Sequence, residues 1–251
     1  MKKLPSYIII GDIRCGTTSF YNMLIQHPKI VPASCKELYF FNHFGKDDRW
    51  NQGIKWYLNH LGDCQEGQIT GEATPEYLWA YKKVPQRINQ VCPNVKFIVL
   101  LRNPVNRIYS HFHLYKRSME VTHRIPVTNS FYKMMEDTFD NKNNAIANIG
   151  RLHLKRGEYA HQLKEWFKIF PREQFLIIKS EDMFKAPNKE VNKAFKFLGI
   201  EEHNIEPIHI AKGKRPEMKK EWKDKLKKYF TQPNHELYEL LGKNLNWEKE
   251  I

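Results

Sequence analysis

The sequence predicts an α/β fold, with a central parallel sheet flanked by helices. Three short apolar runs read as buried strands, at residues 7–10, 96–101 and 175–178. Helical patterns lie between them, and strands that alternate with helices indicate a mainly parallel sheet covered on both faces. The 251 residues suffice for one core, so we expect a single domain over residues 1–251.

The first two strands each lead into a predicted helix. The first strand meets Gly11, and a helical pattern then runs over about residues 17–26 and ends before Pro28. After the second strand, Asn103 is expected to cap a helix whose first residue is Pro104. Both strands therefore present a turn and a helix N-terminus at their carboxyl ends.

Two further helices flank the third strand. Apolar residues recur at helical spacing over residues 159–167, which Pro171 follows, and again over residues 191–198 before Gly199. These apolar stripes predict helices that pack against the sheet.

The remaining segments are more polar. Residues 117–150 predict peripheral helices and loops, either a flap over a binding site or a solvated connection. Near the C-terminus, residues 218–229 place apolar side chains on one helical face. Residues 233–241 then predict a last short helix, capped by Gly242.

The composition bounds the function. Lysine and arginine total 41 against 28 acidic residues, a formal charge of +13, which indicates an anionic partner. A nucleotide, a nucleic acid, a sulfated glycan and a membrane surface all remain open. The four cysteines include no C-x-x-C pair and no zinc-ligand spacing with histidine, so we expect no metal.

No membrane span is expected, because no apolar stretch approaches the ~20 residues that a bilayer requires. The residues from Met1 to Pro5 precede the first strand directly and leave no room for a signal peptide. A cytoplasmic location is the expectation.

The turn after the first strand predicts a phosphate site. It reads Gly-Asp-Ile-Arg-Cys-Gly-Thr-Thr and lies where a strand passes into a helix, so backbone N–H groups at the helix N-terminus face a ligand. Threonine hydroxyls add donors. We expect the nucleotide-binding residues of this turn to be Arg14, Cys15, Gly16, Thr17 and Thr18.

The same turn argues against nucleotide hydrolysis. Its spacing matches the ATP-binding P-loop, but Thr17 occupies the position of the lysine that reaches the β- and γ-phosphates. Arg14 supplies a cation earlier in the turn. A glycine turn that serves packing alone is the alternative.

Two further basic elements predict a second anion site. Arg102 ends the second strand, where ligands of open α/β sheets bind, and Ser110 follows about two helical turns later. In Lys212, Gly213 and Lys214, a glycine between cations lets the backbone approach a ligand closely. The alternatives are an arginine paired with a surface carboxylate and ordinary solvated lysines.

Together these segments resemble the sulfotransferases that use 3′-phosphoadenosine 5′-phosphosulfate (PAPS). The glycine turn resembles the family's 5′-phosphosulfate loop. Residues 102–110 resemble its 3′-phosphate segment R-[DN]-P-x-x-R-x-x-S, and residues 36–41 the K-E-x-x-F-F element of the heparan sulfate branch and its bacterial relatives. Further matches occur in family order at residues 71–77, 157–159, 166–174 and 212–214.

The resemblance runs from residue 7 to about residue 218 and implies a P-loop-like sheet. It is nearest to heparan sulfate N- and 3-O-sulfotransferases and bacterial sulfotransferase-domain proteins. It implies transfer of a sulfonate from PAPS to a hydroxyl or amine of a carbohydrate or small-molecule acceptor, with release of 3′-phosphoadenosine 5′-phosphate (PAP) and without a metal.

The resemblance also implies residue roles. Glu37 acts as general base, and Arg14 stabilises the leaving oxygen. Arg102 and Ser110, with Lys214, hold the 3′-phosphate. A surface carboxylate paired with Lys36 is the alternative for Glu37.

This chain departs from the family at several points. Arg14 stands where a lysine is frequent, and Ala73 stands where heparan enzymes tend to have a lysine. The cysteine pair of those enzymes is absent from this sequence, and we expect no N-terminal anchor of their kind. These departures weaken heparan sulfate as the acceptor more than they weaken sulfotransfer. Since other branches use a histidine base, His27, His111 and His113 are secondary candidates.

Two other functions remain open from the sequence. One is a P-loop kinase of nucleosides or small molecules, although no magnesium-binding aspartate follows a strand. The other is a basic nucleic-acid-binding protein, but no binding signature appears, so no nucleic acid partner is expected. The acceptor's identity and the oligomeric state are not encoded in any motif that we find.

Overall fold

The computed structural model describes residues 2–42, 48–122, 130–208 and 216–249. The chain divides into two compact units. The first comprises residues 1–102 and 162–212, and the second residues 103–161 and 213–251. The single domain expected over the whole chain stays a prediction. Over the described ranges, no helix combines the length and the apolar character that crossing a membrane demands.

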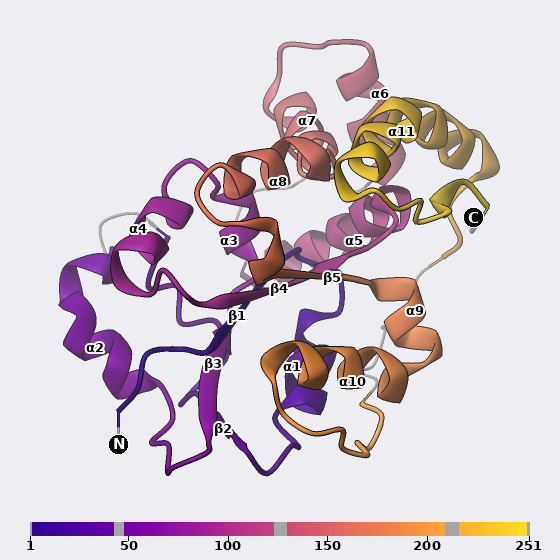
Figure 1. Cartoon of the computed structure of the whole chain (residues 1–251). Helices are drawn as coiled ribbons and strands as arrows, with labels where there is room; N and C mark the ends of the chain where they lie inside the picture. Colours follow the sequence, from indigo (N-terminus) through magenta and orange to yellow (C-terminus); the bar gives the residue numbers. More distant parts are fainter. Residues whose placement is uncertain (1, 43–47, 123–129, 209–215, 250–251) are drawn as a thin grey trace. The chain divides into compact units, whose positions relative to one another are not determined.

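A parallel sheet forms the centre of the first unit (Figure 1). In the described residues its strand order is β2-β3-β1-β4-β5, and every pairing is parallel. The strands are β1 (Tyr7–Gly11), β2 (Ile30–Pro32), β3 (Ile69–Ala73), β4 (Lys96–Leu101) and β5 (Phe175–Lys179). The predicted parallel sheet and its three apolar strands are confirmed.

Sequence reasoning missed β2 and β3, and each has a physical reason. β2 has three residues, too few for a period-2 pattern to be read. β3 contains Gly71 and Glu72, which break its apolar run. Gly71 is required because a Cβ there would lie 2.3 Å from the carbonyl oxygen of Tyr7, its partner on β1.

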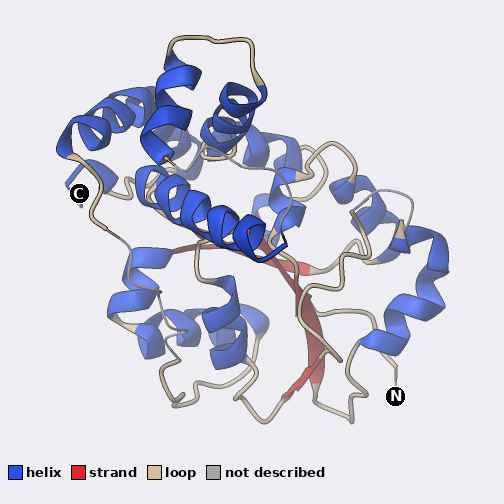
Figure 2. Ribbon diagram, turned by 180° about the vertical axis from the view of Figure 1, so that it is seen from behind, coloured by secondary structure: helices blue, strands red, loops and turns tan. Residues whose placement is uncertain are grey.

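Helices cover both faces of the sheet (Figures 1 and 2). The α-helices within the first unit are α1 (Thr17–Leu24), α2 (Gly53–His60), α3 (Glu76–Trp79), α4 (Val84–Val91), α9 (Ser180–Lys185) and α10 (Pro187–Leu198), with 3-10 helices η1 (Arg49–Gln52) and η2 (Arg172–Gln174). α8 (Tyr159–Phe167) starts in the second unit and ends in the first. α1 ends two residues before the predicted Gln26, and α10 ends as predicted, with Gly199 at a φ of 82°.

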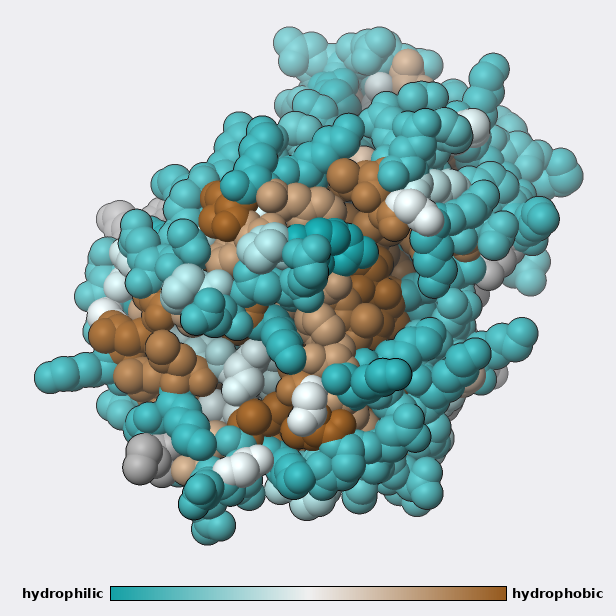
Figure 3. All heavy atoms as spheres, in the orientation of Figure 1, coloured by the Kyte–Doolittle hydropathy of each residue, from teal (hydrophilic) through white to brown (hydrophobic). Residues whose placement is uncertain are grey.

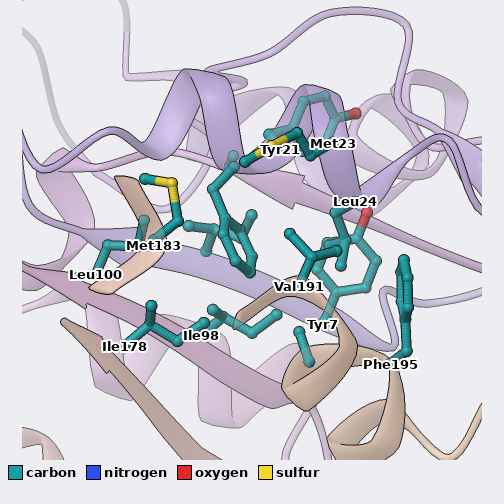
Figure 4. Close-up of a cluster of buried hydrophobic side chains, with 14 of the residues drawn as sticks. Tyr7, Tyr21, Met23, Leu24, Ile98, Leu100, Ile178, Met183, Val191 and Phe195 are labelled. Carbon is teal, nitrogen blue, oxygen red and sulfur yellow. The ribbon is translucent and has the colours of Figure 1, made fainter. Parts of the chain in front are cut away.

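One face of the sheet packs against α1, α9 and α10 (Figure 4). The cluster buries aliphatic and aromatic side chains, each contributing about 1.5–3 kcal/mol. Its labelled members are Tyr7, Tyr21, Met23, Leu24, Ile98, Leu100, Ile178, Met183, Val191 and Phe195. The same packing holds the start of α1, and with it the glycine turn, against the sheet.

Aromatic rings cover part of the opposite face. The ring of Phe97 on β4 lies 5.2 Å from Trp166 and 4.7 Å from Phe170, centroid to centroid. The indole N–H of Trp166 donates to the carbonyl of Leu78 at 3.2 Å. This confirms that the predicted apolar stripe of α8 packs into the core.

The second unit is helical in its described residues. Its helices are α5 (Pro104–Thr122), α6 (Phe131–Phe139), α7 (Ala145–Lys155), α11 (Lys220–Leu241) and the 3-10 helix η3 (Trp247–Lys249). The side chain of Asn103 accepts from the N–H of Val105 at 3.0 Å, which confirms the predicted cap of α5. The predicted helices within residues 117–150 are present as the end of α5, α6 and α7, and residues 123–129 lie outside the described ranges.

The prediction of two C-terminal helices is wrong, because α11 runs unbroken through Pro233. A proline inside a helix removes one hydrogen bond and costs about 3 kcal/mol. Burial of Phe230, Asn234 and Leu237 on the face that continues from Leu226 offsets this cost. Gly242 ends the helix at a φ of 62°, as predicted.

The surface of the protein is consistent with its composition. The face shown in Figure 3 is mainly hydrophilic, with smaller hydrophobic areas. Charged residues make up 27% of the sequence, and long charged side chains dominate such surfaces.

Candidate active site

One edge of the sheet gathers the predicted site residues of the first unit. The glycine turn follows β1, Arg102 follows β4, and the N–H of Glu37 donates to the carbonyl of Ala73, the last residue of β3, at 3.0 Å. These strands are parallel neighbours, so their carboxyl ends share an edge. Because adjacent strands lie about 4.8 Å apart, the ends of β3 and β4 on either side of β1 are about 10 Å apart.

The glycine turn has the geometry of an anion cradle. Its Arg14 and Gly16 adopt left-handed φ angles of 69° and 85°, and Gly16 is the N-cap of α1. The first N–H groups of a helix have no carbonyl partner within it and attract anions. At the N-terminus of this helix, Thr17 is buried and Thr18 is exposed. The backbone and Thr18 thus suit the predicted phosphate.

Two side chains that directly follow β4 and β5 hold the turn. The guanidinium of Arg102 donates to the carbonyl of Arg14 at 3.1 Å and lies over the ring of Phe184, 5.8 Å from its centroid. The hydroxyl of Ser180, the first residue of α9, lies 2.7 Å from the carbonyl of Cys15. Both contacts fix carbonyl groups of the turn, and the N–H of Cys15 donates within the turn to the carbonyl of Asp12 at 3.1 Å. The sequence carried no signal for Ser180 beyond its place after a strand.

The carboxylate of Glu37 is fixed by two neighbours. It forms an ion pair with Lys36 and accepts from the hydroxyl of Tyr39 at 2.6 Å. The pairing with Lys36 that a surface carboxylate would show is therefore present. The Glu37 side chain is nevertheless only 34% exposed, and it also accepts a hydrogen bond from Tyr39. Burial, followed by the bond to Glu37, raises the pKa of Tyr39, so that hydroxyl stays a donor at neutral pH.

Glu72 is a fully buried acid that sequence reasoning did not single out. It lies on β3 and accepts from the hydroxyls of Tyr57 at 2.9 Å, Tyr77 at 3.2 Å and Thr74 at 2.7 Å. Burial raises its pKa to about 7, although these donors and the backbone of Leu38 act in the other direction. Its only sequence signal was its place in the family-like segment 71–77.

The raised pKa makes stability depend on pH. The folded state binds the Glu72 proton more tightly than the unfolded state, whose pKa stays near 4.5. The resulting stabilisation is complete below pH 4.5 and is lost as the pH rises through about 7. This difference in pKa between the folded and unfolded states corresponds to about 3 kcal/mol of stability.

We therefore expect the free energy of unfolding of Glu72→Gln to depend less on pH than that of the wild type. Urea denaturation at pH 5 and pH 8 measures the free energy of unfolding of both proteins. The wild type should lose up to about 3 kcal/mol more than the variant between these pH values. A wild-type loss no larger than that of the variant would exclude a raised pKa for Glu72.

Other predicted residues lie in the second unit or outside the described ranges. Ser110 lies on α5, as predicted, and is 1% exposed, and its pairing with Arg102 stays a prediction. The segment Lys212, Gly213 and Lys214 falls outside the described residues. Among the histidines, the ring nitrogens of His27 lie 3.1 Å from the carbonyl of Glu201 and 3.1 Å from the N–H of Lys29, which indicates a structural role.

Arg107, the second arginine of the family-like segment, lies inside the second unit. It is fully buried and donates to the carbonyl of His153 on α7 at 2.7 Å. Burial, and then the charges of Arg107 and Arg156, lower the pKa of His153 to about 3. His153 is therefore neutral, and Arg107 ties α5 to α7.

Comparisons with known proteins agree with this architecture. A family model described as the sulfotransferase domain matches residues 4–244. The human heparan sulfate glucosamine 3-O-sulfotransferase 5 is 28% identical over 270 residues, which cover 98% of this chain and 75% of that protein.

The solved structures that this chain resembles are also sulfotransferases. A sulfotransferase from Alicyclobacillus acidocaldarius superposes with a TM-score of 0.75 at 25% identity, over 98% of this chain and 99% of that chain. Mouse sulfotransferase SULT7A1 complexed with PAP has a TM-score of 0.50 at 17% identity, over 81% and 62% of the two chains, and supports the fold alone. With a family model that spans nearly all of its length, the chain belongs to the sulfotransferase family.

Proposed function

We propose that this sulfotransferase moves a sulfonate from PAPS to a hydroxyl or amine of a carbohydrate or small-molecule acceptor and releases PAP. One observation carries the proposal. The glycine turn, Glu37 and Arg102 occupy the carboxyl ends of three adjacent parallel strands. An anion cradle, a carboxylate and a second cation at neighbouring strand ends suit a nucleotide with two separate phosphate groups.

The donor set of the first unit fits such a nucleotide. The N–H groups at the start of α1, with Thr17 and Thr18, would hold the 5′-phosphate. Arg102 would hold the 3′-phosphate through charge-assisted hydrogen bonds. The roles predicted for Ser110 and for residues 212–214 stay predictions from the sequence.

PAPS supplies an activated sulfonate when it is bound. Glu37 takes the proton of the acceptor hydroxyl or amine as that atom bonds to sulfur, and the bond between sulfur and the 5′-phosphate oxygen breaks. General-base assistance of this kind is worth about 10²–10⁴-fold in rate. Arg14 stabilises the charge that develops on the departing oxygen.

A carbohydrate hydroxyl is the acceptor that the comparisons favour. The human relative acts, by its name, on heparan sulfate glucosamine. Ala73 replaces a lysine of the heparan enzymes, so we propose an acceptor that needs less positive charge at this position. A kinase is not favoured, because Thr17 fills the P-loop lysine position and the family model is that of a sulfotransferase.

Replacing Gly16 by Ala should weaken nucleotide binding. A side chain at a φ of 85° is strained by about 1–2 kcal/mol, and its Cβ would lie 2.7 Å from the side chain of Met183. Gly199→Ala is the matched control, since its φ is 82° and nothing lies within 4 Å of its Cβ. Denaturation should show a loss of stability in both variants, with a larger loss in Gly16→Ala because of the contact with Met183.

Calorimetric titration with PAP should then distinguish Gly16→Ala from Gly199→Ala by their affinities for PAP. We expect roughly tenfold weaker binding, about 1.4 kcal/mol, for Gly16→Ala alone. Equal PAP affinities in the two variants would contradict a binding role for the turn.

An acceptor screen tests the proposed function. The purified chain is incubated with sulfur-labelled PAPS and a panel of polysaccharides, oligosaccharides, phenols and amines. Labelled product and stoichiometric PAP are expected with at least one carbohydrate. If only amines or phenols are labelled, the proposal of a carbohydrate acceptor is wrong. If the protein does not bind PAP, the proposal of PAPS as the donor is wrong.

A further inference from the structure

The segment that carries Glu37 has a strained backbone. Glu37 and Tyr39 adopt φ angles of 67° and 52°, in the left-handed region that side chains disfavour. Each such residue costs about 1–3 kcal/mol and persists only where its surroundings impose it. Some part of the fold must therefore hold residues 37–41 in this conformation.

Arg49 and Arg87 donate to the carbonyls of Leu38 and Phe41. A second set of hydrogen bonds, to N–H groups of the segment, is centred on Glu72. The N–H of Tyr39 donates to the hydroxyl of Thr74 at 3.4 Å, and that hydroxyl donates to Glu72 at 2.7 Å. The N–H of Phe41 donates to the hydroxyl of Tyr77 at 3.2 Å, and that hydroxyl donates to Glu72 at 3.2 Å. The backbone of Leu38 lies near the Glu72 carboxylate and lowers its pKa.

Two backbone N–H groups of one five-residue segment thus converge on a single buried acid. Each link passes through a hydroxyl that accepts from the segment and donates to Glu72. In its ionised form Glu72 only accepts, so the Thr74 and Tyr77 hydroxyls then donate to it. Inside the protein such chains of hydrogen bonds strengthen one another.

We propose that Glu72 is a positioning residue for the general base: through Thr74 and Tyr77 it holds residues 37–41 in the strained conformation that aims the Glu37 carboxylate at the acceptor. This inference rests on the proposed function. Glu72 is fully buried, so its carboxylate is not exposed to a ligand in this structure. Its contribution is therefore to turnover through Glu37, and not to nucleotide affinity.

The chain offers a matched set of variants. Thr74→Val removes one hydroxyl and cuts the link between Tyr39 and Glu72, whereas Thr74→Ser keeps it. Tyr57→Phe removes a donor to Glu72 at 2.9 Å from α2, which is not part of the segment. Thr74→Val and Tyr57→Phe thus each take one hydrogen bond from the same acid, but only the first loosens the base.

Activity is the first readout. Because a displacement of about 1 Å can cost 10²-fold, we expect Thr74→Val to lower kcat by about 10–100-fold. PAP affinity should be unchanged, Thr74→Ser should restore kcat, and Tyr57→Phe should lose stability with little loss of kcat. Equal losses of kcat in Thr74→Val and Tyr57→Phe, or a loss of PAP affinity that matches the loss of kcat, would overturn the proposal.

Amide hydrogen exchange is the second readout and needs no turnover. Exchange at Tyr39 and Phe41 should accelerate in Thr74→Val and in Glu72→Gln, and stay slow in Tyr57→Phe. Unchanged exchange in Thr74→Val overturns the positioning role even if the enzyme is active. Faster exchange in a protein that transfers no sulfonate supports the positioning of the segment and overturns the proposed function instead.

Discussion

Replacing Glu37 by Gln is expected to lower kcat by about 10²–10⁴-fold while PAP affinity stays near that of the wild type. Glutamine keeps the shape of the side chain and a carbonyl oxygen that Lys36 and Tyr39 can contact. It does not accept the proton of the acceptor at neutral pH. The loss should therefore appear in transfer of labelled sulfonate under saturating PAPS, and not in a calorimetric titration with PAP.

A matched control separates chemistry from the loss of a surface ion pair. Glu201 also pairs with a lysine, since its carboxylate lies 2.6 Å from the ammonium of Lys29. It belongs to the same unit and is half exposed. Glu201→Gln should retain full turnover. Near-normal turnover in Glu37→Gln would remove Glu37 from the mechanism.

Replacing Arg102 by Ala is expected to weaken PAP binding far more than binding of adenosine 5′-phosphosulfate, which lacks the 3′-phosphate. A hydrogen bond to a charged group contributes about 1.5–3 kcal/mol, so PAP affinity should fall by about 10–100-fold through this contact. Competition titrations of both nucleotides against the wild type and the variant measure the difference.

The second nucleotide is the internal control for this variant. Arg102 also donates to the carbonyl of Arg14 at 3.1 Å, so its removal disturbs the glycine turn and weakens both nucleotides by a shared amount. Only the excess loss for PAP reports the 3′-phosphate. Equal losses for the two nucleotides would place the 3′-phosphate elsewhere.

Features set by neighbouring residues could be predicted from the sequence. The apolar run of β4 and the Asn103 cap that follows it depend on local patterns, and both are confirmed. The glycine turn is of the same kind, because a strand, two glycines and a helix start within a few residues. Its left-handed Gly16 lies where the pattern requires it.

Features that depend on long-range packing could not be predicted. β3 is stabilised by its neighbours on both sides and not by its own apolar content, since it contains a glycine and a glutamate. The network around Glu72 joins residues from position 39 to position 77 through hydroxyl groups that no periodicity reveals. Likewise α11 passes through Pro233 because burial outweighs a local signal to stop.

A crystal structure of the enzyme with PAP tests the central claim most directly. The 5′-phosphate is expected on the N–H groups of residues 16–18 and the 3′-phosphate against the guanidinium of Arg102. The carboxylate of Glu37 should face the free side of the 5′-phosphate, where the sulfonate and the acceptor would lie. PAP bound at another edge of the sheet, or a Glu37 side chain that opens onto a different surface, would contradict the account.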